Sequence, residues 1–183
     1  MHSENELGYQ TRSDGFGILY GEIAGALIER CGRNGMGIVR KAVAAYGKKK
    51  GKRLREQYMG SGVRTDLHNL MAAEDGCWKD PRTLKTTVRD TPEAQLWEIY
   101  SCPLEKNWRD RGREEAGRLY CEEYLHALMD GYGEGAGQAN VSNSKTCRRD
   151  DRCVMAMYCR TANQNETQKG TGDGNGIIRE IPV

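Results

Sequence analysis

The fold is decided by residues 112–130, which read GREEAGRLYCEEYLHALMD. Apolar side chains recur there at helical spacing, so the stretch predicts an amphipathic helix with one buried face. The same helix carries a thiol, Cys121, and one of the chain's three histidines, His126. If the chain has an active site, this helix is the first place to look. The residues expected on its buried face are Leu119, Tyr120, Tyr124, Leu125 and Leu128.

Further elements are expected on both sides of this helix. Before it, residues 18–30 and 36–59 have helical spacing and are separated by a turn at 31–35, and Val63–Ala73 is a candidate short helix. Ala94–Ser101 alternates like a strand, and Cys102-Pro103 starts a short helix because proline favours the first helical position. After it, residues 138–144 and 154–160 are expected to pair as a hairpin.

This order of elements predicts an α+β fold, in which N-terminal helices pack on a small antiparallel sheet in a single domain. The chain has 183 residues, a length that suits one domain. We expect a flexible N-terminal segment at 1–17, the domain at 18–160, and a polar, partly disordered tail at 161–183 that is rich in Asn, Gln, Thr and Gly.

Composition narrows the class of function. The net charge of +2 argues against a dedicated nucleic-acid binder. No apolar run approaches the ~20 residues of a membrane span, and the polar start has no secretory signal, so we expect a cytoplasmic protein without membrane partners. Seven cysteines in that compartment favour reduced thiols, metal ligation or catalysis over structural disulfides. The apolar content is modest, so a homodimer or a metal could complete the core.

Cys121 is the first candidate for chemistry, because a thiolate is a strong nucleophile. His126 is the candidate base, although five residues rotate a helix by about 140° and place the two side chains on different faces. Glu122 and His126 do share a face, which suits a carboxylate orienting an imidazole or a two-ligand metal site. The alternative is that Cys121 is a core residue and His126 a surface residue.

A second candidate site is built from cysteines. Cys147 and Cys153 are separated by five residues, slightly more than zinc-binding pairs usually have. Cys102 or Cys121 could complete a site of three or four sulfurs, so the cofactor is either zinc or none. The alternative is a pair of ordinary cysteines at strand ends.

Candidate substrate contacts come from basic and aromatic residues. A basic block covers residues 40–55 and could be a solvated helix face or a site for a substrate carboxylate or phosphate. Aromatic side chains could line a small-molecule pocket, although they are more often core residues. The candidates are Arg40, Arg53, Arg55, Trp97 and Tyr124.

The chain resembles the L-2-amino-thiazoline-4-carboxylic acid hydrolase family in three places. These are the basic, glycine-marked stretch 35–55, the run from Cys102-Pro103 through Trp108 and Gly117-Arg-Leu-Tyr-Cys121 to Tyr132, and the segment 150–153. The resemblance implies hydrolytic opening of a small heterocycle: water adds to an amidine-like ring carbon, the C–S bond breaks, and N-carbamoyl-cysteine forms. It also implies that Cys121 is nucleophile or metal ligand, that His126 transfers the proton, and that an arginine of the basic block holds the carboxylate.

The C-terminal half also resembles the vinyl-reductase-type small-ligand domain. That resemblance implies zinc bound by Cys121, Cys147 and Cys153. Ser144 stands where the resemblance calls for a glutamate, so Cys102 or His126 would have to replace that ligand. The alternative function is therefore a small-ligand-binding module without turnover, and in both cases the partner is a small molecule.

Overall fold

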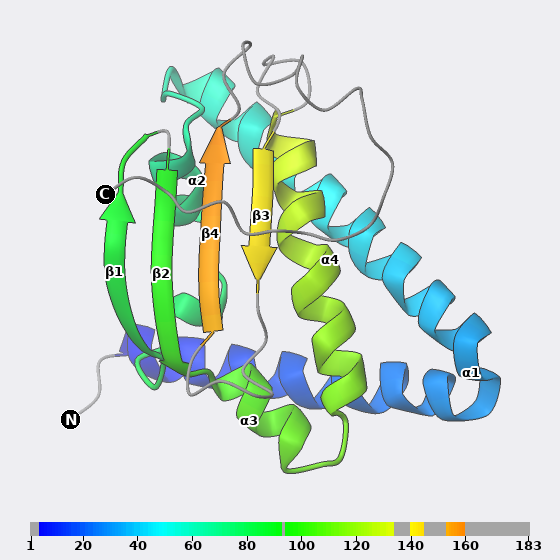
Figure 1. The fold of residues 1–183 in the computed structure, drawn as a ribbon. Helices are drawn as coiled ribbons and strands as arrows, with labels where there is room; N and C mark the ends of the chain where they lie inside the picture. Colours follow the sequence, from blue (N-terminus) through cyan, green and yellow to red (C-terminus); the bar gives the residue numbers. More distant parts are fainter. Residues whose placement is uncertain (1–3, 93, 134–139, 145–152, 160–183) are drawn as a thin grey trace.

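The computed structural model describes residues 4–92, 94–133, 140–144 and 153–159 (Figure 1). Their order of helices and strands confirms the α+β class. The elements are α1 (Glu4–Ser61), α2 (Leu67–Ala73), the 3-10 helix η1 (Cys77–Lys79), β1 (Leu84–Asp90), β2 (Ala94–Ser101), α3 (Pro103–Arg109), α4 (Glu114–Gly133), β3 (Asn140–Ser144) and β4 (Cys153–Cys159).

The four strands form one antiparallel sheet in the order β1-β2-β4-β3. On β2, alternate residues are buried, with Trp97 and Ile99 on the inner face as the sequence predicted. Met155 lies opposite Trp97 on β4 and is buried on the same face. The helices gather on this inner face of the sheet (Figure 1), so the core lies between the two layers.

Helix α1 contains both helices that the sequence predicted, joined at a kink. Gly32 has φ 53° and ψ −130°, a backbone conformation that a residue with a side chain rarely adopts. The bend falls within the turn expected at 31–35 and reverses the course of α1 across the molecule (Figure 1).

The start of α1 differs from the prediction, because the chain is helical from Glu4 onward where a flexible segment was expected. Two contacts distant in sequence explain the difference. The Trp108 indole donates to the carbonyl of Gly17 at 2.9 Å, and Arg82 pairs with Asp14 at 3.0 Å. Sequence periodicity does not reveal such tertiary contacts.

The first half of α1 also buries a different face from the one predicted. The apolar residues at helical spacing in 18–30 include Leu19 and Ile23, but both are exposed, whereas Gly21, Ala24 and Gly25 face the rest of the protein. Small residues are favoured there because the rings of Tyr20, Tyr120 and Trp108 fill the space between α1 and α4. Whether a second copy covers the exposed side chains is untested, so the homodimer stays a prediction.

The second half of α1 crosses α4 with almost no side chain between the backbones. A Cβ atom built on Gly51 would lie 2.0 Å from the carbonyl oxygen of Leu128, and one on Gly131 would lie 2.0 Å from that of Lys48. The glycines inside the basic half of α1 therefore have a packing reason. This close crossing fixes α4 beside the sheet.

Strand β1, in the segment 60–92, was not predicted from the sequence. Every residue of β1 is exposed, so no alternation of apolar and polar side chains marks it. The tail 161–183 and Cys147 lie outside the described residues. Among the described helices, none combines the length and apolar character needed to cross a membrane.

Candidate functional site

A cavity of about 110 Å³ lies between the sheet and α4. Its size is comparable to cavities that accept a benzene-sized molecule. Five elements supply its walls: η1, β2, β4, α3 and α4. The lining residues that matter below are Gly76, Cys77, Trp78, Cys102, Glu105, Glu114, Arg118, Tyr120, Cys121, Tyr124 and Cys153.

Two thiols from different elements meet at the base of this cavity. The sulfurs of Cys77, on η1, and Cys102, between β2 and α3, are 3.7 Å apart and share one hydrogen bond. Cys102 donates it while both groups are thiols, and Cys77 donates it once Cys102 is ionised. This hydrogen bond lowers the pKa of Cys102 and, together with burial, raises the pKa of Cys77. Of the pair, Cys102 is therefore the thiol that ionises first, and Cys77 is the one that keeps its proton.

The local sequence explains why Cys102 is placed in this way. It precedes Pro103, which biases it to the extended conformation observed, φ −128° and ψ 119°, and makes it the N-cap of α3. Its sulfur makes no full capping hydrogen bond. The amides of Glu105 and Leu104 nevertheless favour its thiolate and add to the effect of Cys77.

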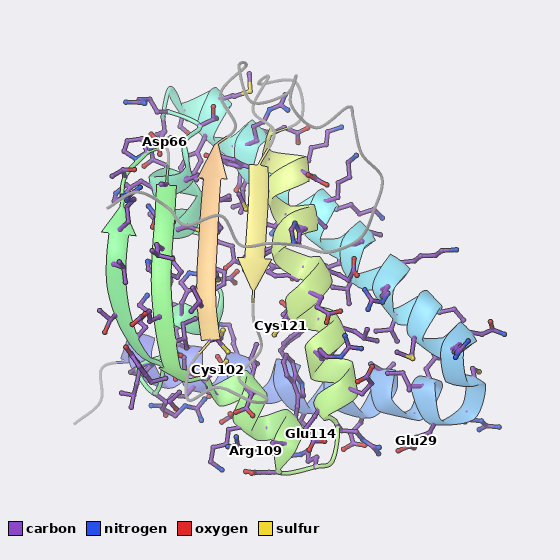
Figure 2. The ribbon with its side chains drawn as sticks, in the orientation of Figure 1. Glu29, Asp66, Cys102, Arg109, Glu114 and Cys121 are labelled. Carbon is purple, nitrogen blue, oxygen red and sulfur yellow. The ribbon has the colours of Figure 1, made fainter. Side chains whose placement is uncertain are left out.

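Cys121, the thiol that the sequence favoured, borders the same cavity from α4. Figure 2 shows it on the side of the helix that faces the sheet, with Cys102 at the junction of β2 and α3. Burial raises the pKa of Cys121, and the negative charge of a Cys102 thiolate raises it further. Cys121 is thus held as a neutral thiol in this environment.

The other two predicted catalytic residues lie outside the cavity lining. His126 is exposed, on a different side of α4 from Cys121, as the helical geometry indicated. Glu122 accepts from Arg40 at 2.8 Å and also pairs with Arg118, so its carboxylate is engaged in an ion-pair network along α4. Neither His126 nor Glu122 lines the cavity, and their catalytic roles remain untested predictions.

The predicted substrate-binding residues do not all lie at the cavity. Tyr124 lines the cavity. Trp97 is buried behind it, with its ring 5.7 Å from that of Trp78. Arg40 pairs with Glu122 and Glu123, Arg53 is exposed, and Arg55 donates to Met59, so the basic block mostly faces away from the cavity.

Three of the four predicted metal ligands lie at the cavity. Cys102, Cys121 and Cys153 line the cavity, and Cys147 is not among the described residues. Cys153 is disulfide-bonded, which departs from the reduced thiols expected and leaves its sulfur without the thiolate character that zinc requires. Within the described residues, no group of three or more His, Cys, Asp or Glu side chains could hold a metal ion.

A buried ionic cluster lies beside the cavity. Glu74 is 1% exposed, and its Oε1 accepts from the Lys50 ammonium and, at 2.6 Å, from the Tyr124 hydroxyl. Burial opposes the charge of Lys50, but Glu74 and Asp75 outweigh it and raise the lysine's pKa. Burial raises the pKa of Tyr124, so its hydroxyl stays a donor. One residue of the basic block thus points inward, to a carboxylate.

Sequence reasoning missed the partnership of Cys77 with Cys102 and that of Glu74 with Lys50. Both depend on the segment 74–80, which has no periodicity to place it. The available signal was its composition, since Glu74, Asp75, Cys77 and Trp78 fall within five residues.

Three comparisons with known proteins complete the description. No curated protein matches the chain. Among solved structures, the chain is similar to trafficking protein particle complex subunit 3 from Naegleria fowleri covalently bound to palmitic acid, with 15% identity, a TM-score of 0.49, and coverage of 82% of this chain and 96% of that one. The sequence profile of the L-2-amino-thiazoline-4-carboxylic acid hydrolases matches residues 16–155, most of the chain. The chain therefore belongs to the L-2-amino-thiazoline-4-carboxylic acid hydrolase family.

Proposed function

We propose that the protein hydrolyses a small ring of the 2-amino-thiazoline type in the cavity between the sheet and α4, with Cys102 as nucleophile. Membership of a hydrolase family supports the reaction class. The observation that carries the proposal is the Cys102 thiol, whose pKa is lowered in an enclosed cavity beside a proton-bearing partner, Cys77. Opposite pKa shifts in two adjacent groups are typical of an acid–base pair.

The first half of the reaction opens the ring. The Cys102 thiolate attacks the ring carbon between nitrogen and sulfur, and the bond from that carbon to the ring sulfur breaks. Cys77 gives its proton to the departing sulfur. The products of this step are a free thiol on the substrate, an isothiourea linked to Cys102, and a Cys77 thiolate.

The second half releases the product. The Cys77 thiolate takes a proton from water, and the resulting hydroxide adds to the isothiourea carbon. The adduct transfers the hydroxyl proton to nitrogen and expels the Cys102 thiolate. The released product is the N-carbamoyl thiol, and both cysteines return to their starting states, so one water is consumed per ring.

A carboxylate on the ring needs a cation, and Arg118 replaces the arginines of the basic block in this role. It is the arginine that lines the cavity within the described part of the chain. Arg118 already pairs with Glu115 and Glu122, which orients its planar guanidinium. The proposal requires reduced Cys77 and Cys102, and both are free thiols in the structure.

A second candidate function is a small-ligand-binding module without turnover. The largely apolar lining, with Trp78, Tyr120 and Tyr124, favours it, because such pockets hold ligands without further chemistry. Zinc would belong to this module. Metal analysis of protein purified without a tag tests that part: stoichiometric zinc supports the module.

The deciding experiment incubates the full-length protein with 2-amino-thiazoline-4-carboxylate and follows the carbamoyl thiol by mass spectrometry. We expect turnover by the wild-type protein and by Cys121→Ala, and none by Cys102→Ser. Binding without turnover would support the module instead. Full activity of Cys102→Ser would remove Cys102 from the mechanism.

A further inference from the structure

The buried carboxylate of Glu74 has hydrogen-bond partners on only one of its two oxygens within the described residues. Oε1 accepts from Lys50 and Tyr124. Oε2 is buried and has no hydrogen-bond partner among the described residues. A buried acceptor without a partner costs free energy, so a protein rarely keeps one unless a ligand or water uses it.

The unpaired oxygen lies directly behind two residues that line the cavity, Gly76 and Trp78. A Cβ atom at Gly76 would lie 2.5 Å from Oε2 of Glu74 and 2.4 Å from Cη2 of Trp78, so both groups pack against the bare Cα of Gly76. Only this glycine and the indole therefore stand between Oε2 and the cavity. Trp78 itself is 7% exposed, and its Nε1–H is a second buried group without a partner within the described residues.

We propose that Oε2 of Glu74 accepts a hydrogen bond from the amino group on the substrate's ring carbon, and that Glu74 thereby selects rings that carry this group. The inference rests on the cavity being the substrate site of the proposed function. A carboxylate can only accept, so it requires an N–H donor. The indole can only donate, so it requires an acceptor such as the ring nitrogen.

The structural roles of Glu74 do not account for Oε2. Its backbone N–H caps α2 by donating to Leu70, and its Oε1 holds Lys50 and Tyr124. Lys50 supplies a compensating positive charge, so Oε2 can receive a neutral amine as well as a cation. These contacts orient the carboxylate and leave Oε2 without a donor among the described residues.

The substitution Glu74→Gln tests the role of Oε2 separately from that of Oε1. Two donors point at Oε1, so the amide oxygen of the glutamine takes that position and its NH₂ group replaces Oε2. The side chain keeps its size and its contacts with Lys50 and Tyr124 but now presents a donor to the cavity. Asp75→Asn is the matched control, because Asp75 also accepts from Lys50, at 2.5 Å, but is half exposed.

The probes are 2-aminothiazoline and 2-methylthiazoline, which differ only by an amino group in place of a methyl group. Calorimetry on the full-length protein measures their dissociation constants. We expect the wild-type protein and Asp75→Asn to bind the amino compound about tenfold or more tightly than the methyl compound. In Glu74→Gln the ratio should fall to about one.

Equal binding of the two probes by the wild-type protein, or binding of neither, overturns the inference, and this comparison needs no variant to fold. An unchanged ratio in Glu74→Gln overturns it as well. Turnover of the carboxylated substrate is measured separately. If the substrate is turned over but the two probes bind equally, the hydrolase proposal holds and the role of Glu74 is contradicted. If there is no turnover but the wild-type protein prefers the amino probe and Glu74→Gln does not, the role of Glu74 holds and the hydrolase proposal is contradicted.

Discussion

The two sides of the cavity present the same chemical group in opposite states. At the base, Cys102 shares a hydrogen bond with Cys77, and its thiolate is favoured by that bond and by the first amides of α3, so its pKa is lowered. On α4, Cys121 is surrounded by buried side chains and by groups that carry negative charge when ionised, so its pKa is raised. The comparison indicates that hydrogen-bond donors around a sulfur decide which thiol can react. The position of Cys121 on the long amphipathic helix α4 does not by itself make it reactive.

The two sides also differ in how they are held. The α4 side is fixed by its backbone-to-backbone crossing with α1 at Gly51 and Gly131. The base is assembled from short elements, η1 and the start of α3. We therefore expect substitutions at the glycines of this crossing to act on stability and substitutions of the two thiols at the base to act on activity.

The largest effect is expected for Cys102→Ser. An alcohol with an ordinary, high pKa replaces an activated thiolate, so kcat/KM should fall at least about a thousandfold. The fold should persist, which the circular dichroism spectrum checks. A decrease of less than tenfold would contradict the contrast between the two thiols.

The next effect concerns the α4 side. In Gly51→Ala, the new methyl group would meet the carbonyl of Leu128, and we expect a loss of about 3 kcal/mol in unfolding free energy. Gly37→Ala is the control, because no atom lies within 4 Å of its added Cβ, and it should gain about 0.5–1 kcal/mol. Urea denaturation measures both, and equal effects would show that α1 and α4 are not in close contact there.

A smaller effect is expected when the donor of the thiol pair is removed. Because the hydrogen bond from Cys77 favours the Cys102 thiolate, Cys77→Ala raises the pKa of Cys102. The thiolate is the active form, so the acidic limb of the pH–rate profile moves to higher pH. Because the proton-transfer group is lost as well, kcat/KM at pH 7 should fall about a hundredfold. Cys77→Ser keeps a donor and should shift the limb less. Identical profiles for the wild-type protein and Cys77→Ala would exclude this role.

The smallest effect is expected for Cys121→Ala. A neutral thiol on the cavity wall contributes packing, so kcat/KM should stay within about threefold of the wild-type value, with a loss of about 1 kcal/mol in stability. Loss of activity in a folded Cys121→Ala would return the nucleophile to α4, where the sequence first placed it.

The sequence was sufficient to predict β2, α3 and α4. The alternation in 94–101, the proline at 103 and the helical spacing around Leu119 each reflect local geometry, and the structure has β2, α3 and α4 at those places. Strand β1 was missed because both of its faces are exposed. The buried face of α1 was misassigned because tight packing selected glycine and alanine over Leu19 and Ile23.

The sequence identified some of the residues of the candidate site but not their partners. Cys102 and Cys121 were both candidates and both line the cavity, and their chemistry stays a prediction. It could not show that η1 brings Cys77 to Cys102, or that Lys50 turns inward to Glu74, because these contacts join segments about 25 residues apart through the tertiary fold. The ionisation of each thiol depends on those contacts.

The most direct test of the account is the pH dependence of alkylation at each cysteine, measured with iodoacetamide and peptide mass spectrometry. The midpoint of each rate profile reports the pKa of that thiol independently of its accessibility. The account predicts a midpoint for Cys102 below the value of about 8.5 for a free cysteine, and a midpoint for Cys121 above it. A lower midpoint for Cys121 than for Cys102 would contradict it.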